Sequence, residues 1–236
     1  MKTVAEFRRE LAAALRLASY FGFSEGICNH FSVQVPSSEE RFLINPYGIH
    51  WSEMRPEHLL LIDGNGAILE GEGEVETTAR NIHIAGHRAN PRHLCLLHTH
   101  MPSATALTMI ESGRLEMAHQ TAARFHGRLA YDDEFGGLAN DEAEGERIAS
   151  KASGGADVIF LANHGVVVGA SSVATAFDDL YYLDRACHQQ VLAMSTGRPL
   201  KLIPQDIVEK TARDWRQGLD VNAAKHFSAL MRIHKL

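Results

Sequence analysis

Apolar residues recur every three or four positions in several long segments of the chain, which is the period of an amphipathic helix. The first segment starts with Thr3-Val4-Ala5-Glu6, a capping-box pattern, and predicts a helix over residues 3–20. Another has Thr77 or Thr78 as its predicted N-cap and ends before Asn90-Pro91. Helices are predicted at 3–20, 77–89, 102–110, 141–153, 173–195, 204–217 and 222–232.

Short apolar runs bounded by turn residues lie between these helices and predict strands. Gly64-Asn65-Gly66 joins two of them in a hairpin, and Pro36–Glu40 joins two others. Strands joined by hairpins are antiparallel. We therefore expect an α/β fold with a mixed, largely antiparallel central sheet between helical layers, not a doubly wound parallel sheet. Strands are predicted at 30–35, 41–45, 59–63, 67–70, 94–98, 128–131, 157–161 and 165–168.

The composition is that of an ordinary globular protein and argues against several classes of partner. The 236 residues carry 23 Lys and Arg against 29 Asp and Glu, a net charge of −6. No segment clusters basic residues, so we expect neither a nucleic acid nor a membrane as partner. Glu6, Arg8 and Arg9 are charged where a signal peptide would have its apolar region, so we expect no signal peptide. Three cysteines without a CxxC pair are typical of a reducing compartment, so we expect a cytoplasmic location. We expect a single domain over 1–236, with polar C-terminal helices at about 204–236 packing at a subunit interface.

Two histidine motifs point to a metal centre. His98 and His100 end a buried strand, and side chains two apart on a strand project to the same side. His164 lies in Asn163-His164-Gly165, where glycine allows close backbone approach and asparagine tolerates a left-handed conformation. Either motif alone would also suit histidines that donate to carbonyls or fill a core. Together, three histidines without a fixed fourth ligand match an open catalytic site for one divalent ion per chain, Zn2+ by ligand type, with Mn2+ or Fe2+ as alternatives.

The chain resembles the class II aldolase/adducin superfamily. The resemblance implies an α/β/α three-layer sandwich, a homotetramer with active sites at subunit boundaries, and a divalent metal held by His98, His100 and His164. The resembling segments are SEGICNHF (24–31), FLINPYGIHWSEM (42–54), LLHTHMPSATALT (96–108), FLANHGVVV (160–168) and AFDDLYYLDRACHQQ (176–190).

The sequence departs from the sugar-phosphate aldolases of that family at two catalytic positions. Their glutamate at the end of a P-S-S-E motif corresponds to Ala79 here. Glu76, three residues earlier, is therefore a candidate catalytic acid, or else an exposed acid that the helix macrodipole favours. The aldolase tyrosine corresponds to Gln120, and the preceding His119 is a candidate proton donor or a surface or interface histidine.

These departures favour metal-dependent decarboxylation of a hydroxy-aromatic acid, of hydroxy-benzoate, hydroxy-phthalate or pyridine-carboxylate type. The region between Lys2 and Lys151 contains no lysine for a Schiff base, whereas decarboxylation needs no strong base to begin. The alternatives are aldol cleavage of a small hydroxy-carbonyl or sugar-derived substrate, non-haem iron oxidative decarboxylation, and an adducin-like scaffold without catalysis. Substrate contacts are expected from Asn29, His30, Thr77, Thr78 and Arg80, although Arg80 is alternatively a solvated surface residue. A flat aromatic wall is expected from His30, Phe31, Tyr47 and Trp51; alternatively, Phe31 and Trp51 are core residues.

Overall fold

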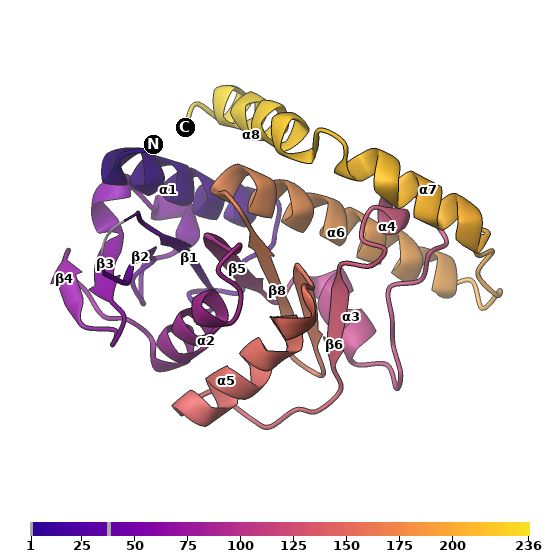
Figure 1. Cartoon of the computed structure of the whole chain (residues 1–236), viewed down its shortest axis with the longest axis horizontal. Coiled ribbons are helices and arrows are strands. Elements are labelled where there is room, and N and C mark those ends of the chain that lie inside the picture. Colours follow the sequence, from indigo (N-terminus) through magenta and orange to yellow (C-terminus); the bar gives the residue numbers. More distant parts are fainter. Residues whose placement is uncertain (1, 37–38) are drawn as a thin grey trace.

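The computed structural model describes residues 2–36 and 39–236 and has an eight-stranded sheet at its centre (Figure 1). The strand order is β4-β3-β2-β1-β5-β8-β7-β6, and all neighbouring pairs are antiparallel except β6 and β7. The predicted mixed, largely antiparallel sheet is therefore confirmed. The strands are β1 (His30–Gln34), β2 (Arg41–Ile44), β3 (Leu60–Asp63), β4 (Ile68–Glu70), β5 (Cys95–Thr99), β6 (Leu129–Asp132), β7 (Val158–Leu161) and β8 (Gly165–Ala170).

Helices cover both faces of the sheet, which confirms the three-layer α/β/α arrangement (Figure 1). Apolar side chains of α2 (Thr77–Ala89) and α5 (Glu142–Ser150) pack on one face, and those of α1 (Val4–Tyr20), α3 (Pro102–Thr108) and α6 (Val173–Met194) on the other. Helices α7 (Gln205–Arg216) and α8 (Leu219–His234) lie outside α6. Helix α8 buries Phe227 and Leu230 in the core of its own chain. A role for the C-terminal helices at a subunit interface remains a prediction.

Most predicted element boundaries agree with the structure to within a few residues. Thr3 and Glu6 form the expected capping box of α1. The N-cap prediction for α2 was wrong, because Glu76 rather than Thr77 or Thr78 caps this helix. In the turn predicted at Pro36–Glu40, residues 37 and 38 lie outside the described residues. The sequence pattern missed helix α4 (Gln120–Ala123) and the 3₁₀ turns η1 (Trp51–Glu53) and η2 (Pro56–His58), and the end of the helix predicted over 141–153 is the 3₁₀ turn η3 (Lys151–Gly154).

A buried arginine–aspartate cluster, which the sequence pattern did not predict, ties α6 to the rest of the fold. Arg124 is 2% exposed and donates to Asp178 and Asp179, two residues in the second turn of α6. Arg128 donates to Asp179 and to Asp157 beside β7. Each buried charge therefore has an opposite charge as partner, which offsets the loss of hydration.

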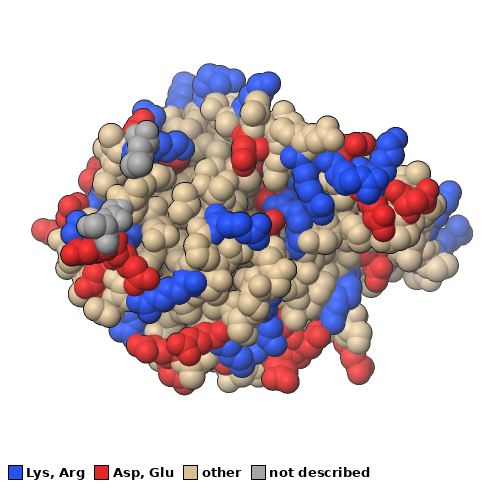
Figure 2. Space-filling view, in the orientation of Figure 1, with Lys and Arg blue, Asp and Glu red and all other residues tan. Residues whose placement is uncertain are grey.

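The surface carries charges of both signs. On the face shown in Figure 2, Lys and Arg side chains are interspersed with Asp and Glu side chains, in line with the small net charge of −6. Among the helices of residues 2–36 and 39–236, none combines the length and the apolar character that a membrane span requires.

Candidate metal centre

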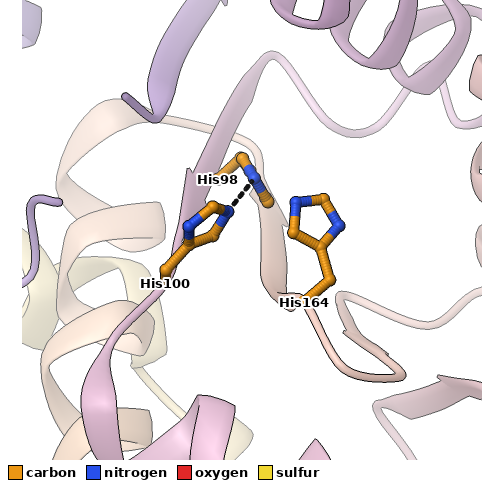
Figure 3. A group of neighbouring side chains, drawn as sticks. All are labelled: His98, His100 and His164. Atoms are coloured by element: carbon orange, nitrogen blue, oxygen red, sulfur yellow. Dashed lines mark hydrogen bonds between the residues drawn. The ribbon is translucent and has the colours of Figure 1, made fainter. Parts of the chain in front are cut away.

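Three histidines from two separate motifs converge at the ends of the neighbouring interior strands β5 and β8 (Figure 3). His98 lies near the end of β5, His100 just beyond it, and His164 in the turn between β7 and β8. Their ring centroids are 4.7–4.9 Å apart, and one ligand atom from each lies within 4.8 Å of the others. Within the described part of the chain, no other group of three His, Cys, Asp or Glu residues meets this criterion.

The backbone around His164 explains why these motifs meet. Strand β5 pairs with β8 up to Thr99 and Val166, which brings the end of β5 beside the β7–β8 turn. Asn163 adopts a left-handed φ of 54°, as its residue type allows. A Cβ on Gly165 would lie only 2.5 Å from the carbonyl oxygen of Thr99 and 2.8 Å from the His100 ring. Glycine is therefore required for the close approach that the sequence motif indicates.

Hydrogen bonds orient two of the rings as metal ligands. Nδ1 of His98 donates to the carbonyl oxygen of Val166 at 3.0 Å, and Nδ1 of His100 contacts the carboxylate of Glu25 directly. Their Nε2 atoms face each other at 3.1 Å, each with a lone pair when the ring is neutral. Two ligands of a tetrahedral zinc ion are about 3.3–3.4 Å apart, so this geometry fits such an ion. Carboxylates and carbonyls commonly orient metal-binding histidines in this way.

The surroundings keep the rings of His98 and His164 in the neutral state that metal binding requires. Burial and the neighbouring histidines hold the pKa of His98 well below its ordinary value. Burial and the nearby His100 lower the pKa of His164 to about 4. A neutral imidazole offers a lone pair to a cation, whereas an imidazolium repels it. At neutral pH both rings are therefore available as ligands.

The histidines open into a cavity of about 230 Å³. Four of the predicted substrate or catalytic residues line it: Asn29, His30, Glu76 and Thr78. The remaining lining residues are Ile27, Cys28, Asn45, Tyr47, Ala79, Ile82, His98, His100, Leu138, Ala139 and His164.

Glu76 is the N-cap of α2 and also lies in the wall of the cavity. Its carboxylate accepts a hydrogen bond from the backbone amide of Ala79 at 2.9 Å, and the hydroxyl group of Thr78 also donates to it. The same carboxylate lies 3.8 Å from Nε2 of His30 in the cavity wall, and the side chain is 33% exposed. Glu76 is thus a helix cap whose charge faces the cavity.

Several predicted site residues lie elsewhere. Thr77 is exposed and does not line the cavity. Arg80 packs its aliphatic carbons over Gly66 and lines a separate cavity between α2 and α5, so it does not reach a substrate beside the histidines. The rings of Phe31 and Trp51 are fully buried with centroids 4.6 Å apart, which makes them core residues. Of the proposed aromatic wall, His30 and Tyr47 line the cavity.

His119 is exposed at the N-cap of α4, where its Nδ1 accepts from the backbone amide of Thr121. It does not line the cavity of its own chain. A contact between His119 and a substrate would therefore require a neighbouring subunit.

The sequence analysis missed Glu25 beside His100 and a buried polar row behind His30. The row consists of Ser32, His83 and His87. Two signals for the row were present in the sequence. His30 and Ser32 are two apart on a predicted strand, and His83 and His87 are four apart on a predicted helix, so each pair shares one face.

The chain matches a known family over most of its length. Residues 9–191 match the model described as "Class II Aldolase and Adducin N-terminal domain". The chain belongs to this family. A crystal structure of an aldolase II superfamily protein from Pseudomonas syringae superposes with a TM-score of 0.91 at 33% identity, covering 98% of this chain and 93% of that one.

One further relative and one further solved structure extend the comparison. An adducin-related protein of Schizosaccharomyces pombe is 33% identical over 94% of this chain and 68% of its own length. L-fuculose 1-phosphate aldolase from Glaciozyma antarctica PI12 superposes with a TM-score of 0.86 over 100% of this chain and 94% of that one. Its identity of 23% establishes a shared fold only. Because the family contains both aldolases and adducins, the function of this chain has to be argued from its site.

Proposed function

We propose that the protein is a metal-dependent carbon–carbon lyase that decarboxylates a hydroxy-aromatic acid, with Zn2+ bound by His98, His100 and His164. The observation that carries this proposal is the arrangement around these ligands. The Nε2 atoms of His98 and His100 face each other beside a small cavity. Ala79, which also lines this cavity, occupies the position where the resembling aldolases have a glutamate. The aldolase base is thus absent from its position, whereas the metal ligands are complete.

The cavity walls suit a flat acid. Apolar side chains of Ile27, Ile82 and Leu138 form part of the lining. Nδ2 of Asn29 is buried and has no hydrogen-bond partner among the described residues, so it is available to a substrate carboxylate oxygen. Oδ1 of Asn29 accepts from the backbone amide of His100 at 3.4 Å, which places this side chain beside the metal ligands.

Decarboxylation breaks the bond between the ring carbon and its carboxylate, and carbon dioxide leaves. When bound, a divalent cation supplies a Lewis acid that binds substrate oxygens and stabilises developing negative charge. The electron pair remains on the ring carbon, which then takes up a proton. Glu76 can hold that proton within the cavity, and His119 can supply it only from an adjoining subunit of a homotetramer.

Aldol cleavage is the second candidate, favoured by one observation. The carboxylate of Glu76 lies in the cavity wall, so a base is present three residues before the position where the aldolases have one. Such a base could act on a small hydroxy-carbonyl substrate.

A direct assay of substrates separates these functions. The purified protein is analysed for metal, loaded with Zn2+, and tested for release of carbon dioxide from ortho-hydroxy-benzoates, hydroxy-phthalates and hydroxy-pyridine-carboxylates. Matched acids without the hydroxyl group serve as controls. We expect release from at least one hydroxylated acid and little cleavage of sugar phosphates.

Other outcomes would contradict the proposal in distinct ways. Cleavage of hydroxy-carbonyl compounds without decarboxylation would favour the aldolase. Turnover that requires both oxygen and Fe2+ would favour an oxidative decarboxylase. Failure to bind any metal would favour an adducin-like scaffold.

A further inference from the structure

A row of buried polar side chains extends from the cavity into the space between the sheet and α2. His30 and Ser32 are two residues apart on β1 and so lie on the same face of the strand. They face His83 and His87, which are one turn apart on α2. Each of the four is at most 5% exposed. Nδ1 of His30 lies 2.8 Å from Nε2 of His83, Nδ1 of His83 contacts Oγ of Ser32, and Oγ of Ser32 lies 2.7 Å from Nε2 of His87. The row is therefore one continuous hydrogen-bonded chain.

The inner end of this chain fixes the direction of every bond in it. Nδ1 of His87 lies 2.8 Å from the backbone carbonyl oxygen of His93, which can only accept, so His87 carries its hydrogen on Nδ1. Nε2 of a neutral His87 then accepts from the hydroxyl group of Ser32. Because a hydroxyl group has a single hydrogen, Ser32 must accept from Nδ1 of His83.

The same logic reaches the cavity. Nε2 of a neutral His83 accepts from Nδ1 of His30, which leaves Nε2 of His30 with a lone pair and no hydrogen. That atom lies in the cavity wall, 3.8 Å from the carboxylate of Glu76. Burial supports the neutral state of the inner rings, since it holds the pKa of His83 well below its ordinary value and lowers that of His87 to about 4.

We propose that Ser32, His83 and His87 position His30 as a hydrogen-bond acceptor, and that Nε2 of His30 receives the hydroxyl group of the substrate. The identity of the hydroxyl donor rests on the proposed function, whereas the tautomers follow from the hydrogen bonds alone. His30 stacks on His98 with ring centroids 4.8 Å apart, so a hydroxyl group bound there lies beside the metal ligands. The hydrogen-bonded row thereby selects substrates that carry a hydroxyl group next to the carboxylate.

The tautomers can be observed without an activity assay. Protein labelled with 15N and 13C in histidine only, loaded with Zn2+ and sedimented, is studied by solid-state NMR, which shows which ring nitrogen carries hydrogen. We expect His30, His83 and His87 all to carry it on Nδ1. A hydrogen on Nε2 of His30 in the wild-type protein would overturn the proposal.

Ser32→Ala tests whether the hydrogen-bonded row determines the tautomer of His30. Without the hydroxyl group, Nδ1–H of His83 has no acceptor, so His83 is expected to carry its hydrogen on Nε2 and donate to Nδ1 of His30. His30 then carries its hydrogen on Nε2, where Glu76 can accept it. Ser32→Thr keeps a hydroxyl group and should keep the wild-type tautomers, with equal zinc content in both variants. An unchanged His30 tautomer in Ser32→Ala would show that the hydrogen-bonded row does not determine it.

Binding separates this inference from the proposed function. Calorimetry of the zinc-loaded protein compares 2-hydroxybenzoate with benzoate, so that the effect of the hydroxyl group is isolated. We expect Ser32→Ala to reduce the preference for 2-hydroxybenzoate about two- to tenfold, the contribution of one hydrogen bond, and Ser32→Thr to restore it. Failure of decarboxylation with these binding results intact would reject only the proposed reaction. An equal preference in wild type and Ser32→Ala would reject the acceptor role.

Discussion

The carboxylate of Glu76 accepts the backbone amide hydrogen of Ala79, the residue at which the resemblance to the aldolases places their catalytic glutamate. Glu76→Gln keeps a side-chain oxygen for this bond but loses the charge, whereas Glu76→Ala loses both. If Glu76 holds a proton in catalysis, both variants should lower kcat by about 10²–10⁴-fold. Only Glu76→Ala should lose helix-cap stability, about 0.5–2 kcal/mol of the free energy of unfolding.

Turnover assays and urea unfolding of the two variants distinguish these roles. Wild-type kcat in Glu76→Gln would show that the glutamate acts as a cap alone.

Metal content tests the histidine triad directly. His98→Ala, His100→Ala and His164→Ala should each lose most of the one divalent ion expected per chain, because three ligands leave no redundancy. His188→Ala is a matched control, since His188 is exposed and bonds only to Ser103 among the described residues. Elemental analysis of the purified variants checks this. Full metal in all three triad variants would remove the assignment.

The carboxylate behind His100 provides a finer test. Glu25 contacts Nδ1 of His100 and so holds its Nε2 toward the other ligands. Glu25→Gln should weaken zinc affinity about 10–100-fold, the usual effect of losing such a partner, without abolishing binding. Competition with a chelator measures the affinity. An affinity equal to that of the wild type would show that the contact does not orient the ligand.

The sequence predicted the sheet and the layers because both depend on local pattern, and it named the three histidines that the structure brings together. Alternating apolar runs with hairpin turns determine antiparallel strands, and His98, His100 and His164 lie at strand ends within short motifs. Arg80 shows where local pattern fails. It lies in the first turn of α2, one residue after Ala79, but its side chain follows the helix surface to Gly66 instead of the cavity. Each residue along a helix points its side chain in a different direction around the helix axis. An error of one or two residues in the predicted N-cap therefore gives the wrong direction for every side chain in the first turn.

The buried row was missed for a related reason. His83 and His87 become partners of His30 and Ser32 only when α2 packs across β1, a contact between residues about fifty positions apart. Likewise, Arg124 and Asp179 read as ordinary surface charges until the fold buries them together. Sequence spacing can place such residues on one face of a helix or strand, but tertiary packing decides which faces meet.

The buried arginine–aspartate cluster should dominate local stability. Asp179 is fully buried and accepts from both Arg124 and Arg128. Asp179→Asn removes one negative charge, so that Arg124 keeps only Asp178 and Arg128 only Asp157 as a carboxylate partner. The loss should cost up to about 3 kcal/mol of the free energy of unfolding, the lower end of the range for breaking a buried pair. The exposed pair of Arg55 and Glu57 is the control, and Arg55→Gln should change stability by less than about 1 kcal/mol. Equal effects of the two substitutions on urea unfolding would contradict this assignment.

Acid should destabilise the protein through its buried neutral histidines. Burial lowers the folded-state pKa of His87 to about 4, whereas an unfolded histidine titrates near 6.5. Between these values the unfolded chain holds a proton that the folded chain does not. The stability is therefore complete above about pH 6.5 and falls by roughly 1.4 kcal/mol per pH unit and histidine as the pH drops toward 4.

His87→Gln should reduce this slope by about one proton between pH 4.5 and 6, measured by urea unfolding of the metal-free protein at several pH values. A slope unchanged by His87→Gln would show that this residue is protonated in the folded state.

The position of His119 predicts a catalytic site shared between subunits. This residue is exposed and outside the cavity of its own chain, so it can return a proton to the substrate only in a neighbouring subunit of a tetramer. Sedimentation should report a homotetramer, and His119→Ala should lower turnover about 10²–10⁴-fold while the metal stays bound. Equal amounts of inactive His119→Ala and inactive His98→Ala chains can be unfolded together and reassembled into mixed tetramers. In a cyclic tetramer, an intact triad then meets an intact His119 of its neighbour at about a quarter of the sites, so activity should return there. Absence of any recovery, with mixed tetramers verified by mass spectrometry, would exclude His119 as a donor across the boundary.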